Sequence, residues 1–165
     1  MSNLHLIFDP HSDPDLLSEF FERFSGAVGS TSADRASLGT ESEQEIRTRI
    51  DPATVSMVLL GTCTWSRAAV DWEIQAALAS APDGVPNGLL ALTLDRNAER
   101  NRMPERLKLN VKSGYARLYR LPRSNEELAA WVRDAGDARR ERRHLSENPP
   151  ARQESDLPCD ETGEW

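Results

Sequence analysis

A single glutamate at the border of an apolar helical stripe is the residue of this sequence best placed to do chemistry. Val70, Ile74 and Ala77 recur at helical spacing, and Glu73 directly precedes Ile74. A carboxylate at such a border is usually a solvated surface group, because glutamate is almost always exposed. The functional alternative is a carboxylate held in a cleft, where it would stabilise a developing positive charge.

Aromatic and basic side chains close to Glu73 could complete a ligand site. Trp65 or Trp72 could stack on a ring. Arg67, or the N–H groups at the start of its helix, could hold a phosphate. Each of these residues would serve equally well in packing or on the surface, so their presence alone does not decide between the two readings.

A strand, a turn and a helix must position these groups. Residues 55–60 form a nearly continuous apolar run ended by Gly61, which predicts a strand covered on both faces. A polar turn over 62–64 follows, and Ser66 is the expected N-cap of a helix that residues 82–84 end. In an open α/β sheet, ligands bind beyond the carboxyl ends of the strands, where this turn lies.

The same stretch resembles the central motif of the TIR-like domain family, in particular the TIR proteins of the bacterial Thoeris antiphage system. The family pattern is an apolar strand, G-x-x-T, a short S/N-R element and V-x-[YW]-E-I. The matching residues are Gly61, Thr64, Ser66, Arg67, Val70, Trp72, Glu73 and Ile74. Ala69 departs from the pattern, since the family usually has Trp there. In order of elements, the resemblance covers roughly residues 4–134.

The resemblance implies that Glu73 is the catalytic residue and that NAD is the substrate, with no separate cofactor. It also implies that the first loop, F-D-P-H-S-D, forms one wall of the nucleotide pocket. The expected substrate-binding residues are Phe8, Asp9, His11, Ser12, Asp13, Thr64, Trp65, Arg67 and Trp72. His11 and Asp13 could instead serve only the turn and the cap of the next helix.

The implied reaction is cleavage of the nicotinamide glycosidic bond. The cationic nicotinamide is already a good leaving group, so cleavage passes through an oxocarbenium-like state that Glu73 would stabilise. Water would give ADP-ribose, an atom of the same molecule would give a cyclic isomer, and a second small molecule would give a conjugate. The resemblance favours a signal nucleotide, of the cyclic kind, that activates a separate effector protein.

Two other functions remain open at this stage. The resemblance implies self-assembly through contacts between TIR domains and a phage protein as trigger. A catalytically silent TIR-like module that works by assembly or phage sensing is therefore the main alternative, and Ala69 and the approximate first-loop pattern favour it. A nucleoside-processing transferase with a similar sheet and a catalytic glutamate is the third reading.

Composition narrows the remaining classes of protein. The formal net charge of −7 over 165 residues argues against a primarily nucleic-acid-binding protein. No apolar run approaches the roughly 20 residues that span a bilayer, and no signal peptide is evident. Cys63 and Cys159 lie far apart and suggest neither a disulfide framework nor a metal site, which favours a reducing cytosol. No dinucleotide fingerprint or Walker sequence is present.

Alternating strand and helix patterns predict a flavodoxin-like, doubly wound, mainly parallel five-stranded sheet. The expected strands are 4–8 at the centre, a weak edge strand over 26–33, then 55–60, 88–94 and an edge strand over 115–121. The expected helices follow Pro14, Ser42 and Ser66, cover 105–109 inside a long excursion over 95–113, and cover 125–135 after the cap Ser124. The resemblance implies that a loop over 34–40 contacts neighbouring protomers or covers the site.

The chain is expected to divide at residue 136. Residues 1–135 would form the TIR-like domain, and 136–165 a basic helix extension followed by an acidic, proline-containing tail. The basic run comprises Arg139, Arg140, Arg142 and Arg143. It indicates a solvated helix end that pairs with acids rather than a phosphate site.

Overall fold

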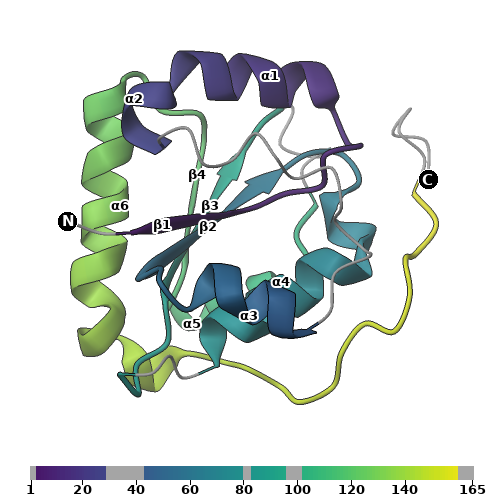
Figure 1. Ribbon diagram of the computed structural model, residues 1–165, viewed down its shortest axis with the longest axis vertical. Coiled ribbons are helices and arrows are strands. Elements are labelled where there is room, and N and C mark those ends of the chain that lie inside the picture. The colour runs from purple at the N-terminus through teal and green to yellow at the C-terminus, as the bar shows by residue number, and fades with distance from the viewer. Residues whose placement is uncertain (1–2, 29–42, 80–82, 96–101, 160–165) are drawn as a thin grey trace.

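The computed structural model describes residues 3–28, 43–79, 83–95 and 102–159. Within these residues, four strands form one parallel sheet in the order β1-β2-β3-β4 (Figure 1). The strands are β1 (Leu4–Ile7), β2 (Val55–Leu60), β3 (Gly88–Thr93) and β4 (Arg117–Tyr119). Every residue of β2 and β3 is buried, as their continuous apolar runs predict.

Helices cover both faces of the sheet, which makes this a mixed α/β fold compatible with the flavodoxin-like class. One face carries α1 (Pro14–Arg23), α2 (Ser25–Val28) and α6 (Asn125–Glu141) (Figure 1). The other carries α3 (Glu43–Ile50), α4 (Ala68–Leu78) and α5 (Glu105–Ser113). Two short 3-10 helices, η1 (Thr64–Ser66) and η3 (Arg143–Leu145), precede α4 and follow α6.

The strands supply two separate hydrophobic cores because successive side chains point to opposite faces. Met57 of β2 packs in the core beneath α1 and α6, together with Phe20. Its neighbour Val58 packs in the core beneath α4 and α5, together with Ile74. The second core holds α4, and with it the candidate glutamate, against the sheet, and α3 packs on α4 through a further small cluster.

The prediction of five strands is wrong, because the described residues hold four. The weak strand expected over 26–33 begins instead with α2, and residues 29–33 lie outside the described part of the chain. Val28 is buried in the core, and the N–H of Ala27 donates to Asn125 Oδ1 over 3.1 Å. This segment therefore packs against α6. As a result β1, expected at the centre, lies at one edge of the described sheet.

Of the helix caps predicted from the sequence, the cap of α6 is confirmed and the cap of α4 is wrong. Ser124 caps α6 as predicted, since its Oγ accepts from the N–H of Glu127 over 3.1 Å. Ser66 does not cap α4, because it lies within η1 and its hydroxyl donates to the carbonyl of Cys63. The capping box expected at Ser42 and the loop over 34–40 lie outside the described residues.

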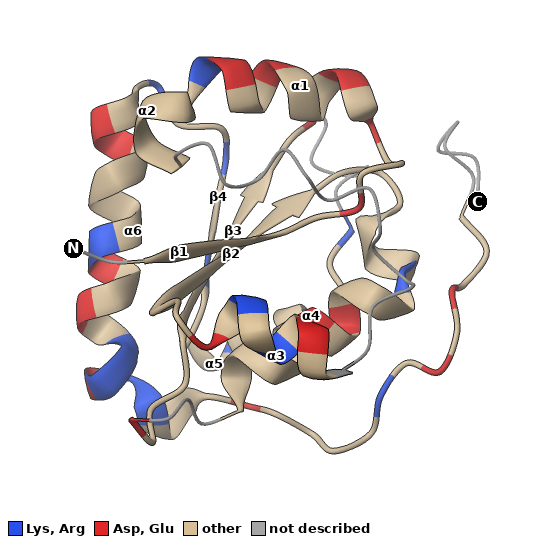
Figure 2. Cartoon of the chain, in the orientation of Figure 1, with Lys and Arg blue, Asp and Glu red and all other residues tan. Residues whose placement is uncertain are grey.

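The basic run predicted after residue 135 prolongs α6 as far as Glu141 and pairs with acids, but the expectation that it is solvated is wrong at Arg139, which is buried. Figure 2 shows Lys and Arg gathered at the C-terminal end of this helix. Arg139 is buried and reaches the carbonyl of Val85 and the carboxylate of Asp83, which Arg140 also contacts. The hydrogen bond from the Val85 N–H and the nearby Arg139 guanidinium hold the pKa of Asp83 below its ordinary value. The helix α6 continues through residue 136, and the division of the chain into two parts there stays a prediction.

The last described segment, residues 146–159, crosses α4 as an extended chain, and we call it the strap (Figure 1). Polar contacts hold its first half. Arg106 of α5 donates to the carbonyls of Pro149 and Ala151, and the N–H of Gln153 donates to Asp71 over 2.9 Å. The tail composition alone gave no reason to expect this docking. Among the described residues, no helix combines the length and apolar character needed to cross a membrane.

Candidate functional site

The turn after β2 is fixed by side chains from the loop after β1. The Oδ2 atom of Asp13 accepts from the N–H of Thr62 over 2.6 Å, and Ser12 Oγ accepts from the N–H of Cys63 over 3.0 Å. Thr64 Oγ1 accepts from the N–H of Gly61 over 2.8 Å. A Cβ at Gly61 would lie 2.5 Å from Asp13 Oδ2, so only glycine allows this close approach. Ser12, Asp13 and Thr64 therefore build the turn and do not line the pocket described below.

Asp13 stands at the first position before α1, but its side chain does not cap the helix. Its backbone is left-handed, with φ 52°, and its carboxylate turns to Thr62 instead. Pro14 occupies the first helical turn, as predicted. The expected turn duty of Asp13 is thus confirmed, whereas the expected side-chain cap is wrong, because the N–H groups of the neighbouring loop compete for the same oxygens.

A pocket of about 470 Å³ lies beyond the carboxyl end of β1 and beside the first turns of α4. Five of the residues predicted for substrate binding line it, together with three of their neighbours in sequence, and the strap supplies the other three lining residues. The lining residues are Phe8, Asp9, His11, Arg67, Ala68, Ala69, Val70, Trp72, Glu154, Ser155 and Asp156. This is the position at which ligands bind in doubly wound sheets.

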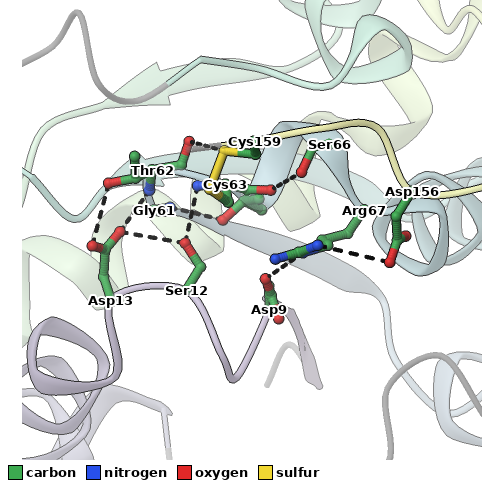
Figure 3. Close-up of a disulfide and its surroundings, with 11 residues drawn as sticks. Asp9, Ser12, Asp13, Gly61, Thr62, Cys63, Ser66, Arg67, Asp156 and Cys159 are labelled. Carbon is green, nitrogen blue, oxygen red and sulfur yellow. Dashed lines mark hydrogen bonds and ion pairs between the residues drawn. A yellow bond between two sulfur atoms is a disulfide. The ribbon is translucent and has the colours of Figure 1, made fainter. Parts of the chain in front are cut away.

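Arg67 lies in the pocket wall between two carboxylates. Its Nε atom is 2.9 Å from Asp9 Oδ2, and its Nη1 atom is 3.8 Å from Asp156 Oδ2 (Figure 3). The other carboxylate oxygen of Asp156 accepts from the N–H of Ala68, at the start of α4, over 2.9 Å. A guanidinium and a helix N-terminus thus meet at one point and hold an anionic side chain of the strap.

The two tryptophans of the motif have different surroundings. Trp72 is partly buried, lines the pocket and donates from Nε1 to the carbonyl of Gln153 over 2.8 Å. Trp65 is buried, with the guanidinium of Arg102 3.9 Å from its ring centroid. Trp65 does not line the pocket. Of the two, Trp72 is therefore the one placed to contact a ligand there.

Glu73 lies inside the fold, with no exposed surface. Its Oε1 atom is 3.0 Å from an Nη2 of Arg49 in α3 and 3.4 Å from Nε2 of His5 in β1. The side chain lies on the inner side of α4 and is not part of the pocket lining, although its neighbour Trp72 is. The reading of Glu73 as a solvated surface group is therefore wrong. A charge this deeply buried needs a cationic partner, which Arg49 provides, and His5 is a second polar group within reach of the same oxygen.

The strap ends in a disulfide that the sequence did not predict. Cys159 pairs with Cys63, which lies 96 residues earlier in the chain (Figure 3). The expectation that the two cysteines form no disulfide is wrong, because the strap crosses α4 and brings residue 159 against the turn after β2. Sequence distance gave no sign of this approach. The expectation of a reducing compartment stays a prediction.

Several residues of the site escaped the sequence analysis. His5 carried a detectable signal, since a lone histidine in the apolar run of β1 must find a buried partner. Arg49 carried none, because its contact with Glu73 depends on how α3 packs on α4. Glu154 and Asp156 lay in a segment whose composition indicated a solvated tail.

Comparison with known proteins supports the resemblance drawn from the motif. Residues 21–99 match the family model of the TIR-like domain of Thoeris protein ThsB. This range contains β2, η1, α4 and β3, and so the whole motif around Glu73. Neither the curated proteins nor the solved structures gave a match. The similarity to the TIR-like domain of the bacterial Thoeris system is therefore confirmed over residues 21–99, which carry the motif around Glu73.

Proposed function

We propose that this protein is a TIR-like enzyme that cleaves the nicotinamide glycosidic bond of NAD, with Glu73 as the catalytic carboxylate. The product would be an ADP-ribose-derived signal, of the cyclic kind, made in antiphage defence. The observation that carries the proposal is the pocket beside the first turns of α4, the helix that also bears Glu73. The family match over 21–99 supports it.

The volume of the pocket and the groups that line it support a ligand of the dinucleotide class. A volume of about 470 Å³ lies inside the usual range for small-molecule sites, about 300–1,000 Å³. Arg67 and the N–H groups of the first turn of α4 suit a pyrophosphate. Phe8 and Trp72 offer apolar walls for a ring. Ala69 also lines the pocket, so its small side chain leaves room that a Trp would fill.

The proposal requires that Glu73 become accessible to the substrate. Glu73 has no exposed surface, so the ribose must displace the groups that cover it before the carboxylate can act. Trp72, the neighbour of Glu73 in sequence, lines the pocket, whereas Glu73 does not. Once the ribose is adjacent, the carboxylate would hydrogen-bond its hydroxyls and stabilise the positive charge that develops as nicotinamide leaves.

The test is mass spectrometry of cells that express the protein, with and without phage, for loss of NAD and appearance of ADP-ribose species. Phage-triggered product in the wild type, reduced by about 10²-fold or more in Glu73→Gln, is the expected result. Glu126→Gln, an exposed glutamate of α6, removes the same charge from the opposite face of the sheet and serves as the control.

The folding of the variant must be measured beside its activity, because Glu73 pairs with Arg49 and His5. Thermal unfolding of purified Glu73→Gln should show a folded domain, since the amide keeps a hydrogen-bond acceptor for both partners. A folded variant with undiminished product would contradict the catalytic role. So would a wild type that makes no NAD-derived product while it protects against phage.

The buried ion pair favours a second candidate function, a catalytically silent TIR-like module that works by self-assembly or by sensing a phage protein. Such a module needs Glu73 only to join α4 to α3 and β1, as its contacts with Arg49 and His5 do. It predicts that Glu73→Gln, if folded, retains protection. It also predicts that changes in the 34–40 loop, which lies outside the described residues, destroy protection.

A further inference from the structure

The strap has two halves that are held in different ways. Residues 147–153 are anchored by buried side chains of α4 and α5. Arg106 and Asn110 are buried, and they bond the carbonyls of Pro149 and Glu147 over 2.6 Å and 2.8 Å. Asp71, also buried, accepts from the N–H of Gln153. Hydrogen bonds to buried groups therefore hold this half of the strap against α4 and α5.

Residues 154–159, which we call the flap, lack such an anchor. Most of the flap is exposed, and Leu157 shows 45% of its surface to solvent. Its contacts with the site include the N–H of Leu157 on the carbonyl of Ser66, the Asp156 carboxylate on Ala68 and Arg67, and Cys159, whose sulfur forms the disulfide and lies 3.7 Å from the carbonyl oxygen of Thr62. A segment with few buried apolar contacts has low local stability, so the covalent bond dominates its attachment.

The flap also forms one wall of the pocket. Glu154, Ser155 and Asp156 line it opposite the loop after β1. The carboxylate of Asp156 occupies the N–H of Ala68 and lies 3.8 Å from Arg67, the two groups best suited to an anionic ligand (Figure 3). A ligand phosphate and Asp156 would compete for the same donors, since both are anions.

We propose that the flap is an autoinhibitory element whose release is controlled by the Cys63–Cys159 disulfide. In the oxidised protein the disulfide holds Asp156 over Arg67 and the start of α4. In the reduced protein the flap swings away about its anchor near Gln153, which opens the pocket to an anionic ligand. The inference rests on the proposed function only in taking the pyrophosphate of a dinucleotide as that ligand, and it does not depend on cleavage.

The redox step requires a dithiol reductant. One thiolate of the dithiol attacks a sulfur of the Cys63–Cys159 bond, which breaks and leaves a mixed disulfide. The second thiolate of the dithiol then displaces the protein sulfur. Two electrons pass to the protein, Cys63 and Cys159 each take up a proton, and the reductant leaves as a disulfide.

The release of the flap is tested by hydrogen exchange of the full chain, with and without dithiothreitol. On reduction, the amide of Leu157 should lose protection, whereas the amide of Gln153 should keep it, because Asp71 still accepts its hydrogen bond. Cys159→Ser should reproduce the reduced pattern without reductant. Unchanged protection at Leu157, or equal loss at Gln153 and Leu157, would overturn the proposal. Protection of β2 and β3 shows that the domain remains folded.

The effect on the pocket is tested by calorimetric titration with inorganic pyrophosphate and with ADP-ribose. Reduction or Cys159→Ser should tighten binding about tenfold, a coupling of ordinary size for two linked equilibria. Asp156→Asn should tighten binding in the oxidised protein as well, because it removes the competing charge. Glu154→Gln removes the same charge from the same wall and should have a smaller effect. Equal affinities in all these states would contradict the competition.

The same titration separates this inference from the proposed function. In Glu73→Gln, where cleavage would be abolished, the redox dependence of pyrophosphate binding should persist. A protein that binds pyrophosphate more tightly when reduced but cleaves no NAD would refute the proposed reaction alone. A protein that cleaves NAD at the same rate in both redox states, with the flap protected in both, would refute the flap alone.

Discussion

The glutamate of the motif is held inside the fold by side chains of two other elements. Glu73 is fully buried, and its partners Arg49 and His5 come from a helix and a strand that are far apart in sequence. Breaking such a pair by removing one member is costly, because a charge remains in a place that water does not reach. A catalytic role would therefore depend on this ion pair to hold the carboxylate until substrate arrives.

Tyr115 gives a prediction about alkaline pH. Its hydroxyl donates to the carbonyl of Asn87 over 2.6 Å, and burial raises its pKa to about 12. The folded state thus holds this proton more tightly than the unfolded chain, whose tyrosine titrates near 10. The stability that Tyr115 contributes is complete below pH 10 and is lost between pH 10 and 12, by about 2–3 kcal/mol.

Tyr115→Phe should remove this loss. At pH 7 the variant should be less stable by about 1 kcal/mol, because the hydrogen bond to Asn87 is gone. Its free energy of unfolding should then fall less steeply than that of the wild type above pH 10. Urea denaturation at pH 7, 10 and 11 measures both effects. Tyr119→Phe is the comparison: burial raises the pKa of this partly buried tyrosine as well, but less than that of Tyr115, so this variant should remove a smaller part of the loss. Equal slopes for wild type and Tyr115→Phe would contradict the assignment.

The packing of α6 on the sheet gives a prediction about an element. A Cβ at Gly88, the first residue of β3, would lie 2.2 Å from the backbone carbonyl oxygen of Ala135 in α6. A backbone atom cannot relieve this overlap by a change of rotamer, as a side chain can. Gly88→Ala should therefore displace α6 from the sheet and destabilise the domain by about 1–3 kcal/mol. Thermal unfolding measures the change.

Gly26→Ala is the matched control for this change. Its added Cβ would meet Asn125 at 3.4 Å, an ordinary contact, and alanine favours the helix α2. The melting temperature of Gly26→Ala should equal or exceed that of the wild type. If Gly88→Ala were equally stable, the close approach of α6 to β3 would be wrong.

The elements that the sequence predicted well are those whose pattern has a local cause. The apolar runs of β2 and β3 and the cap of α6 at Ser124 depend on neighbouring residues only. The excursion after β3 was predicted to hold a short helix, and α5 is longer than expected because its pattern continues to Ser113. The edge position of β1 could not be predicted from its own sequence. It depends on residues 26–28, which form part of α2 and not the neighbouring strand that was expected.

The part of the candidate site that was predicted is the part that depends on local sequence motifs. Phe8, Asp9, His11, Arg67 and Trp72 line one pocket, as the motif and the first loop suggested. The wall formed by the strap could not be found in the sequence, because polar, proline-containing segments indicate solvation unless a partner is known. That partner is the set of buried polar groups on α4 and α5.

At the scale of the molecule, the disulfide joins the end of the described chain to the turn after β2. It closes a loop of 96 residues whose described part contains β3, β4 and the α-helices α4, α5 and α6. In the chain-entropy account, a loop of this length gives a stabilisation of about 2–5 kcal/mol. Cys159→Ser should lower the free energy of unfolding by that amount under oxidising conditions, as measured by urea denaturation.

The same measurement under reducing conditions is the control. Wild type with dithiothreitol and Cys159→Ser should then unfold at the same urea concentration, because neither contains the closed loop. A wild type whose midpoint is unaffected by reductant would show that Cys63 and Cys159 are not joined in solution. Surface charge cannot mimic this effect, since neither condition changes the net charge of −7.

The order of the strands has a consequence for how the protein is made. Each strand from β2 onward pairs with the one synthesised before it, so the sheet can grow from one edge to the other as the chain leaves the ribosome. Cys159 emerges after all four strands. Its sulfur can therefore bond to that of Cys63 only after the four strands have been synthesised. A chain that ends before the strap has a pocket that lacks the wall formed by Glu154, Ser155 and Asp156.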